Sequence, residues 1–272
     1  RGLGDVYKRQ VLGHPITHSL SPTLHNAGYA ALGLEHDYVA IDIQEHEFMD
    51  FLGTLDSQWM GLSLTMPLKE IVLSATDQIS DEARLAQSAN TLIIGQQLVA
   101  TNTDIQGIVQ AFAEVDVVHV DTMAIIGSGA TARSAVVAAG HLGVDELSII
   151  ARNQNSAKQC WQIAQDLGIT ARVMAPDDAD FSWAQATVNT TPAFAMDTYA
   201  NSIPEVAGPL LDVVYSPWPT ALARRWDELG GRICPGYLML LHQAAAQFAL
   251  MTEKEAPLEA MRTALLAALP SK

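Results

Sequence analysis

Lys69 lies in a long stretch of the chain that has almost no other cationic residue. Between residues 10 and 132 the only other Lys or Arg is Arg84, against 15 Asp and Glu. Alternating apolar residues lead into a polar Thr65, and Pro67 then ends the predicted strand and can open a helix at its first turn. A lone ammonium group at a strand-to-helix junction indicates an acid/base or charge-stabilising role. The alternative is a solvated lysine at a helix start.

Two serines near the amino terminus form a second polar cluster, in the run His18-Ser-Leu-Ser-Pro22. Hydroxyl groups two residues apart near a helix start are well suited to bind a carboxylate. We therefore interpret Ser19 and Ser21 as an anion-binding pair. The alternative is that Ser21 is only the N-cap of a helix over Pro22–Leu32.

A third cluster, Asn102-Thr-Asp104, follows a predicted strand and precedes a predicted helix, with Asn90-Thr91 just upstream. Asp104 could be a simple helix cap. Paired with Lys69, it becomes half of an acid/base dyad, because a nearby carboxylate favours the ammonium form whereas burial opposes it. That balance can adjust the lysine for proton transfer.

The run Gly127-Ser-Gly-Ala-Thr-Ala132 follows the apolar strand Met123–Ile126 and opens a helix, which is the context of a dinucleotide fingerprint. Gly127 permits the tight turn, Gly129 allows a pyrophosphate to approach the backbone, and Ala132 takes the third small position. Amide groups at the helix start then bind the pyrophosphate. An ordinary tight turn is the alternative.

The residues after the second strand of this unit indicate which dinucleotide binds. An NAD site usually carries Asp or Glu there. This chain has Ala151-Arg-Asn153, with Lys158 one turn later and no carboxylate before Asp166. Arg152 can bind a 2′-phosphate and stack on adenine, which favours NADP. The alternative is that Arg152 is a solvated loop cation.

Composition excludes several classes of protein. The chain has 272 residues, of which 49% are hydrophobic and 17% charged, so one large or two smaller domains with a sizeable core are expected. A net charge of −15 argues against nucleic-acid or anionic-membrane surfaces, which need clustered cations. Cys160 and Cys234 lie far apart, which fits a reducing cytoplasm rather than a disulfide framework. The most apolar run, Tyr237–Met251, is interrupted by polar side chains and is not expected to span a membrane.

No metal site is predicted. His14 and His18 are four residues apart, but they flank Pro15 in a loop, and neither an HExxH motif nor a cysteine cluster accompanies them.

Strands that alternate with helices predict βαβ units and a parallel sheet. The expected strands are Val11–Gly13, Tyr38–Ile43, Trp59–Thr65, Thr91–Ile94, Gln97–Ala100, Met123–Ile126, Glu146–Ala151, Ala171–Met174, Ala186–Asn189, Leu210–Val214 and Arg232–Cys234. The expected helices are Pro22–Leu32, Glu45–Leu55, Leu68–Ser74, Asp81–Gln87, Asp104–Ala113, Ala132–His141, Asn155–Leu167 and a tail over Tyr237–Leu269 that Pro257 divides.

The first ten residues, Arg1–Gln10, are basic in an acidic chain and lack the apolar core of a signal peptide. They are similar to translated adaptor or vector sequence. We therefore expect a non-native leader, with the ordered pattern beginning at Val11.

Several of these motifs, in this order, resemble the shikimate dehydrogenase family of the aromatic amino-acid and chorismate pathway, and the Met-Pro-Leu-Lys wording is similar to actinobacterial members. The resemblance runs from Val11 to about Leu269. It is based on Ser19-Leu-Ser-Pro22, Thr65-Met-Pro-Leu-Lys69, Ala89-Asn-Thr91, Asn102-Thr-Asp104, the glycine loop, Asn189-Thr-Thr191, Asp212–Tyr215 and Gln243-Ala-Ala.

The resemblance implies an α/β fold in which an N-terminal α/β substrate domain is joined to a Rossmann-type NADP-binding domain, with C-terminal helices packing back on the substrate domain. The implied bounds are a leader over 1–10, a substrate domain over 11–105, a dinucleotide domain over 106–236 and returning helices over 237–272. The implied reaction is the NADP-dependent reversible reduction of 3-dehydroshikimate to shikimate. A monomer or homodimer in the cytoplasm, with no nucleic-acid or membrane partner, is expected.

The family's functional residues carry over to matching positions of this chain. Lys69 and Asp104 are implied as the catalytic pair. Contacts to substrate are implied for Ser19 and Ser21 at the carboxylate and for Thr65, Asn90, Asp104, Tyr215 and Gln243 at the ring hydroxyls. Contacts to NADP are implied for Gly127, Ser128, Gly129, Ala130, Thr131, Arg152, Asn153, Val213, Gly236 and Met239.

The chain also departs from the family pattern. Many members have Asn where Ser63 stands, Asn-Arg-Thr in place of Ala151-Arg-Asn153, and Asp before the glycine where this chain has Cys234-Pro235. Three alternatives stay open, namely a quinate or quinate/shikimate dehydrogenase using NAD or NADP, a folate-linked methylene dehydrogenase and a non-enzymatic NADP-binding regulator. Ser21, where a bulkier Thr could favour quinate, argues against the first. The serine pair argues against the second and the Lys69–Asp104 pair against the third.

Overall fold

The computed structural model describes residues 7–269, and the chain divides into two compact units. One unit contains the chain up to Thr103 together with Gln243–Ala268, and the other contains Asp104–His242. Each unit is built around its own six-stranded sheet. The predicted α/β class, with two sheets, is therefore confirmed.

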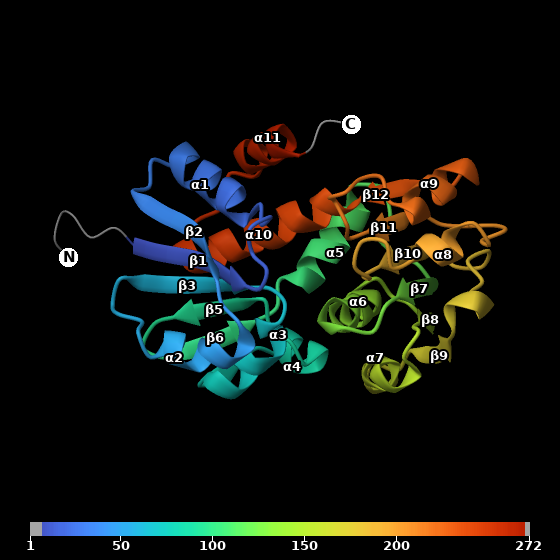
Figure 1. Ribbon diagram of the computed structural model, residues 1–272, viewed down its shortest axis with the longest axis horizontal. Coiled ribbons are helices and arrows are strands. Elements are labelled where there is room, and N and C mark those ends of the chain that lie inside the picture. Colours follow the sequence, from blue (N-terminus) through green and yellow to red (C-terminus); the bar gives the residue numbers. More distant parts are fainter. Residues whose placement is uncertain (1–6, 270–272) are drawn as a thin grey trace. The chain divides into compact units, whose positions relative to one another are not determined.

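The first unit has a mixed sheet with the strand order β2-β1-β3-β5-β6-β4 (Figure 1). Its strands are β1 (Tyr7–Gly13), β2 (His36–Asp42), β3 (Trp59–Leu64), β4 (Gln78–Ile79), β5 (Thr91–Ile94) and β6 (Leu98–Thr101). β1 pairs in parallel with β2 and β3, whereas β5 runs antiparallel to β3 and β6. The carboxyl ends of β1, β2 and β3 therefore lie at one edge of the sheet.

β1 begins four residues earlier than expected, at Tyr7. Residues 7–10 pair with β2, residues 8–10 also pair with β3, and the Arg9 side chain is only 2% exposed. The guanidinium group of Arg9 donates hydrogen bonds to the Met251 carbonyl oxygen at 3.2 and 2.8 Å. The expectation that order starts at Val11 is thus wrong, because two neighbouring strands supply backbone partners for the preceding residues. Residues 1–6 of the predicted leader lie outside the described residues, and its non-native origin stays a prediction that the mass of the native protein would test.

Short helices connect these strands. They are α1 (Ser21–Ala31), the 3-10 helix η1 (Glu45–Glu47), α2 (Phe48–Leu52), α3 (Leu68–Ile71), the 3-10 helix η2 (Val72–Ala75) and α4 (Asp81–Ala86). Two helices expected as single pieces, Glu45–Leu55 and Leu68–Ser74, each contain a 3-10 segment instead. α1 packs beside the C-terminal α11 (Leu258–Ala268). Leu12, Leu62 and Leu92 form part of the core under the sheet, and each is fully buried.

The second unit has an entirely parallel sheet with the order β12-β11-β10-β7-β8-β9 (Figure 1). Its strands are β7 (Thr122–Ile126), β8 (Glu146–Ile150), β9 (Thr170–Met174), β10 (Ala186–Asn189), β11 (Leu210–Asp212) and β12 (Ile233–Pro235). If β7 is numbered as strand 1 and the sheet is followed from β9 to β12, the strand order is 3-2-1-4-5-6. This is the order of dinucleotide-binding sheets. Met123–Ile126 are all buried, as expected for a central parallel strand with both faces covered.

The helices of the second unit are α5 (Asp104–Ala113), α6 (Ala130–His141), α7 (Gln154–Asp166), the 3-10 helix η3 (Pro176–Asp178), α8 (Asp197–Ala200) and α9 (Ala221–Glu228). α6 packs against both α5 and α7. α10 (Gly236–Thr252) begins in this unit and continues into the first. α9 is absent from the predicted helices, although Thr220 caps it by accepting the Ala223 amide at 3.0 Å, and Trp226 anchors it in the core.

Among residues 7–269, no helix is both long enough and apolar enough to cross a membrane.

Candidate active site

Three of the predicted substrate residues, together with Lys69, lie in segments that follow β1 and β3. Ser19 and Ser21 follow β1, whereas Thr65 and Lys69 follow β3. Because these strands run in parallel, the segments that follow them leave the sheet at the same edge. Residues far apart in the sequence are thus presented together by the sheet.

The two serines are held by the turn before α1. The Ser19 amide donates to the Ile16 carbonyl oxygen at 3.0 Å, and the Ser21 amide donates to Ser19 Oγ at 3.3 Å. α1 starts at Ser21 itself, and Leu20 is its N-cap. The alternative that Ser21 is only an N-cap is therefore wrong. Its side chain is 7% exposed and lies within the helix start.

Lys69 is anchored through its backbone. The Thr65 amide donates to Leu12 O at 2.9 Å, and the Thr65 carbonyl accepts the Leu68 amide at 2.8 Å, which starts α3. The Lys69 carbonyl accepts the Ala89 amide at 2.7 Å. Pro67 is the N-cap of α3, so the predicted strand-to-helix junction is confirmed. Rigid backbone contacts on both sides thus fix where the ammonium-bearing side chain begins.

Buried amide and hydroxyl groups connect Asn90, Thr103 and Gln243. Asn90 Nδ2 donates to Thr103 Oγ1 at 2.9 Å and to Gln243 Oε1 at 3.2 Å, and Asn90 Oδ1 accepts the Thr103 amide at 2.8 Å. Thr103 Oγ1 donates to the Gln243 carbonyl at 3.0 Å. All three side chains are less than a tenth exposed. The structure therefore brings the predicted substrate residues Asn90 and Gln243 into direct contact.

Gln247, which was not among the predicted site residues, extends this network. Its Nε2 donates to the Asn90 carbonyl and to Thr91 Oγ1, both at 2.9 Å, and its Oε1 accepts Ser63 Oγ at 2.8 Å. Ser63 Oγ in turn accepts a short hydrogen bond from the Tyr38 hydroxyl. Ser63, which replaces the Asn of many family members, is therefore part of a continuous network. Gln247 lies one helical turn after Gln243, and that spacing was the available signal.

Tyr38 links this network to the serine pair. Burial raises the pKa of the Tyr38 hydroxyl, and its hydrogen bonds with Ser63 and Ser21 act in the opposite direction. The His25 ring stacks on Tyr38, with ring centroids 4.1 Å apart and planes 5° apart. Burial lowers the pKa of His25 to about 3, so this imidazole is neutral at physiological pH.

Asp104 is the first residue of α5 and is 4% exposed. Lys69 belongs to the first unit and Asp104 to the second. The pairing of these two side chains therefore stays a proposal, which is taken up below.

The glycine loop of the second unit has the geometry expected of a phosphate-binding turn. Gly127 has φ +118°, a conformation that favours glycine, and a Cβ on it would lie 2.2 Å from Thr190 Oγ1. Gly129 is the N-cap of α6, and a Cβ there would meet nothing within 4 Å. Space is thus open for a ligand in front of the first amides of the helix. Ser128 Oγ lies 2.6 Å from Ser156 Oγ, which fixes the middle of the loop.

Arg152 and Asn153, which follow β8, have different surroundings. Arg152 is exposed, so its guanidinium group is accessible to a ligand. Asn153 caps α7, and its Oδ1 accepts the amides of Asn155 at 2.9 Å and Ser156 at 3.3 Å. The cap explains why Asn stands here. The cofactor role implied for Asn153 stays a prediction.

Val213, Gly236 and Met239 lie near the carboxyl ends of β11 and β12. The Val213 amide donates to Asn189 O at 3.0 Å. Gly236 opens α10, and a Cβ on it would lie 2.2 Å from the Asp212 carbonyl oxygen, so only glycine allows this approach. Met239 is 7% exposed on α10.

Asp212, at the end of β11, orders the loop that carries Tyr215. Its Oδ1 accepts Asn189 Nδ2 at 3.0 Å and the Val214 amide at 3.1 Å, and its Oδ2 accepts Thr220 Oγ1 at 2.7 Å. Burial raises the pKa of Asp212, and these hydrogen bonds oppose that shift. Burial also raises the pKa of Tyr215. Asp212 begins a motif on which the family resemblance rests, but its role in ordering this loop was not predicted.

No group of three or more His, Cys, Asp or Glu side chains within residues 7–269 could hold a metal ion. His14 and His18 are both exposed in the loop after β1.

Comparison with known proteins agrees with this geometry. Residues 11–92 match the model of the shikimate dehydrogenase substrate binding domain, and residues 236–266 match that of the shikimate 5′-dehydrogenase C-terminal domain. The NADP(+) shikimate dehydrogenase of Symbiobacterium thermophilum is 33% identical over 99% of this chain and 96% of its own length. The chain belongs to the shikimate dehydrogenase family.

Solved structures of this family support the same assignment. Shikimate dehydrogenase of Mycobacterium tuberculosis is 39% identical, with a TM-score of 0.89 over 96% of this chain and 99% of that one. Shikimate 5-dehydrogenase of Thermus thermophilus, in complex with NADP(H) and shikimate, is 28% identical, with a TM-score of 0.85 over 97% of this chain and 100% of that one. The family that the motifs predicted is thus confirmed.

Proposed function

We propose that the chain catalyses the NADP-dependent, reversible reduction of 3-dehydroshikimate to shikimate. The single observation that carries this proposal is the grouping of the serine pair, Thr65 and Lys69 at one edge of the first sheet, in a chain that belongs to this family. A carboxylate-binding pair beside a lysine fits a small anionic substrate with a reactive oxygen.

Ser19 and Ser21 bind the substrate carboxylate, while Thr65, Asn90, Tyr215 and Gln243 contact the ring hydroxyls. Support comes from the network around Asn90, in which buried amide groups are already oriented by one another. A polyhydroxylated ring needs donors and acceptors in fixed positions, because a misplaced buried polar group costs free energy. Side chains oriented before binding avoid part of that cost.

Lys69 and Asp104 act on the reacting oxygen. NADPH, when bound, supplies the hydride that reduces the ring carbonyl. The Lys69 ammonium group stabilises the negative charge that develops on the carbonyl oxygen, and Lys69 with Asp104 delivers the proton that completes the hydroxyl group. In the reverse direction the same pair removes that proton.

The residues of the second unit fit an NADP molecule. The open space at Gly129 and the start of α6 suit the pyrophosphate, and the exposed Arg152 suits the 2′-phosphate. The amides of Gly127–Thr131 hold the phosphates, and Asn153 contacts the adenosine side. Val213, Gly236 and Met239 contact the nicotinamide. With no carboxylate between β8 and Asp166, NADP is preferred over NAD.

A substrate and cofactor panel tests the proposal. The formation of reduced cofactor is measured by absorbance with shikimate or quinate, each with NADP+ or NAD+. The expected result is the highest kcat/KM for shikimate with NADP+. A higher kcat/KM for quinate would support the quinate dehydrogenase alternative, and a preference for NAD+ would contradict the role of Arg152.

The cellular location and the oligomeric state of the enzyme are part of the same proposal. The acidic charge and the two widely spaced cysteines fit a cytoplasmic enzyme that acts as a monomer or homodimer without nucleic acid or membrane partners. Sedimentation analysis at several concentrations would distinguish monomer from dimer.

A further inference from the structure

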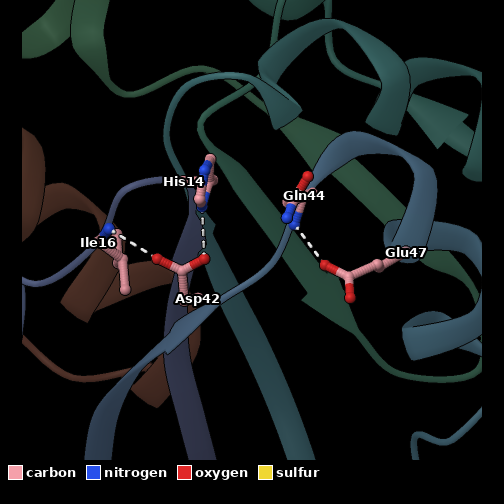
Figure 2. A network of polar contacts seen from close by, with 5 residues as sticks. All are labelled: His14, Ile16, Asp42, Gln44 and Glu47. Atoms are coloured by element: carbon pink, nitrogen blue, oxygen red, sulfur yellow. Dashed lines mark hydrogen bonds and ion pairs between the residues drawn. The ribbon is translucent and has the colours of Figure 1, made fainter.

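The turn that leads to the serine pair is held by a side chain from a neighbouring strand. Asp42, the last residue of β2, uses both carboxylate oxygens on this turn (Figure 2). Its Oδ1 lies 2.6 Å from His14 Nδ1, and its Oδ2 accepts the Ile16 amide at 3.2 Å. A single carboxylate therefore fixes both ends of the segment His14-Pro-Ile16.

The hydrogen bonds continue from Ile16 to the serines. The Ile16 carbonyl oxygen accepts the Ser19 amide at 3.0 Å, and Ser19 Oγ accepts the Ser21 amide at 3.3 Å. Asp42 therefore holds the amide of Ile16, and the carbonyl group of the same residue holds Ser19. The His14 amide also donates to the Met66 carbonyl at 2.9 Å, which ties the same turn to the segment that carries Lys69.

We propose that Asp42 is a positioning residue for the substrate carboxylate, acting through Ile16 on Ser19 and Ser21. It does not touch the substrate. It sets the distance and direction of the two hydroxyl groups, and His14 holds the carboxylate in the rotamer that reaches the Ile16 amide. This inference rests on the proposed function, because it assumes that the serines bind a carboxylate.

The solvent exposure of Asp42 and His14 indicates that these side chains position the turn and do not form part of the folded core. The Asp42 and His14 side chains are 44% and 48% exposed, so neither fills the core. His14 lines an open pocket of about 410 Å³ with Glu45, His46 and Pro67. The hydrogen bond from His14 also lowers the pKa of Asp42, which keeps this carboxyl group ionised. Truncation of Asp42 should therefore disturb the turn without unfolding the unit.

The chain contains a matched control close by. Glu47 accepts the Gln44 amide through Oε2 at 2.9 Å, so it makes the same type of carboxylate-to-backbone bond in the next turn (Figure 2). The donor, Gln44, is the N-cap of η1 and lies away from the serine turn in sequence. Glu47→Gln thus tests whether loss of any exposed carboxylate of this region affects substrate binding.

The experiment compares steady-state constants for shikimate oxidation in the full chain. Asp42→Ala should raise the KM for shikimate about tenfold, as expected for one lost charge-assisted hydrogen bond, and leave kcat and the KM for NADP+ unchanged. Asp42→Asn retains an acceptor for the Ile16 amide and should restore most of the wild-type KM. Glu47→Gln should behave as wild type.

A double-mutant cycle with Ser19→Ala completes the test. If Asp42 acts through Ser19, Asp42→Ala should have little further effect on the KM for shikimate once the Ser19 hydroxyl is gone. Full additivity of the two effects, or an unchanged or lower KM in Asp42→Ala alone, would overturn the inference while leaving the proposed function intact. A wild-type chain with no activity on shikimate would overturn both.

Discussion

The polar groups around Asn90 in the first unit are side chains that bond one another, whereas the glycine loop of the second unit presents backbone amides at the start of α6. Asn90, Thr103 and Gln247 are buried and hydrogen-bonded across segments far apart in the sequence. The glycine loop instead presents the start of α6, and Gly129 has nothing near the position of a Cβ. We therefore expect these two regions to recognise ligands through different chemistry.

This difference reflects what each ligand requires. A ring with several hydroxyl groups needs particular donors and acceptors, and a buried network supplies them already oriented. A pyrophosphate needs negative charge to be stabilised, which helix amides do without side chains. The first unit should therefore be sensitive to the loss of single side chains, and the second to the gain of a single methyl group.

The largest effect is expected at Lys69. Lys69→Ala should lower kcat about 10²- to 10⁴-fold, because it removes the charge that stabilises the reacting oxygen, and it should leave NADP binding nearly unchanged. Arg84→Ala is the matched control, since Arg84 is the other cation of this stretch and pairs with Asp81 on the surface at 3.2 Å. Steady-state kinetics measure both variants. Wild-type turnover in Lys69→Ala would refute the mechanism.

Removal of the Arg152 side chain should reduce the selectivity for NADP+ over NAD+ rather than the turnover number of the enzyme. Arg152→Ala should lower the preference for NADP+ over NAD+ about 10- to 100-fold, the effect of losing a charge-assisted bond to the 2′-phosphate. The ratio of kcat/KM values for the two cofactors measures it. Arg224→Ala removes an exposed cation of α9 and should leave the ratio unchanged. An equal drop in both variants would indicate a general charge effect.

Substitution by alanine should affect the free energy of unfolding differently at Gly127 and at Gly129. Gly127→Ala places Cβ 2.2 Å from Thr190 Oγ1 at a φ of +118°, so the free energy of unfolding should fall by about 1–3 kcal/mol. Gly129→Ala meets no atom within 4 Å and should leave that free energy nearly unchanged. Urea unfolding of both variants tests the contrast. Equal stabilities would mean that Gly127 does not need its left-handed conformation.

The first unit should carry a pH dependence that comes from His25. Burial lowers the pKa of His25 to about 3, against about 6.5 in the unfolded chain. Between these two pKa values the unfolded chain binds more protons than the folded chain. The contribution of His25 to the free energy of unfolding is therefore fully present above about pH 6.5 and is lost as the pH falls toward 3. The slope contributed by this group is at most about 1.4 kcal/mol per pH unit.

Replacement of His25 by a ring that does not titrate tests this expectation. His25→Phe retains a ring beside Tyr38, where the centroids lie 4.1 Å apart, and should flatten the fall in unfolding free energy between pH 6.5 and 3. The measurement is urea unfolding at several pH values. An unchanged slope in the variant would show that other groups produce the acid sensitivity.

Local patterns in the sequence predicted much of this architecture. β10 over Ala186–Asn189 and α5 over Asp104–Ala113 have the predicted bounds, because apolar periodicity and caps are local signals. The glycine loop was also recognised from its neighbours. α9 was missed, and so was the start of β1, which depends on pairing with β2 and β3.

The missed site residues depend on contacts that no local pattern encodes. Ser63 meets Gln247 across 184 positions of the chain, and Asp42 meets Ile16 from another strand. Strand order and register create these contacts, so a single sequence shows only that polar residues stand in apolar surroundings. Gln247 had such a signal, one helical turn after Gln243, whereas Asp42 had none.

The central claim is that the side-chain network around Asn90 in the first unit binds shikimate, whereas the backbone amides of the glycine loop in the second unit bind the pyrophosphate of NADP. Calorimetric titration of two variants, Gln247→Leu and Gly129→Ala, with shikimate and with NADP+ tests it directly. Gln247→Leu should weaken shikimate binding about tenfold and leave NADP+ binding unchanged, because it leaves buried partners unsatisfied in the first unit only. Gly129→Ala should weaken NADP+ binding and leave shikimate binding unchanged. Equal weakening of both ligands by either variant would contradict the claim.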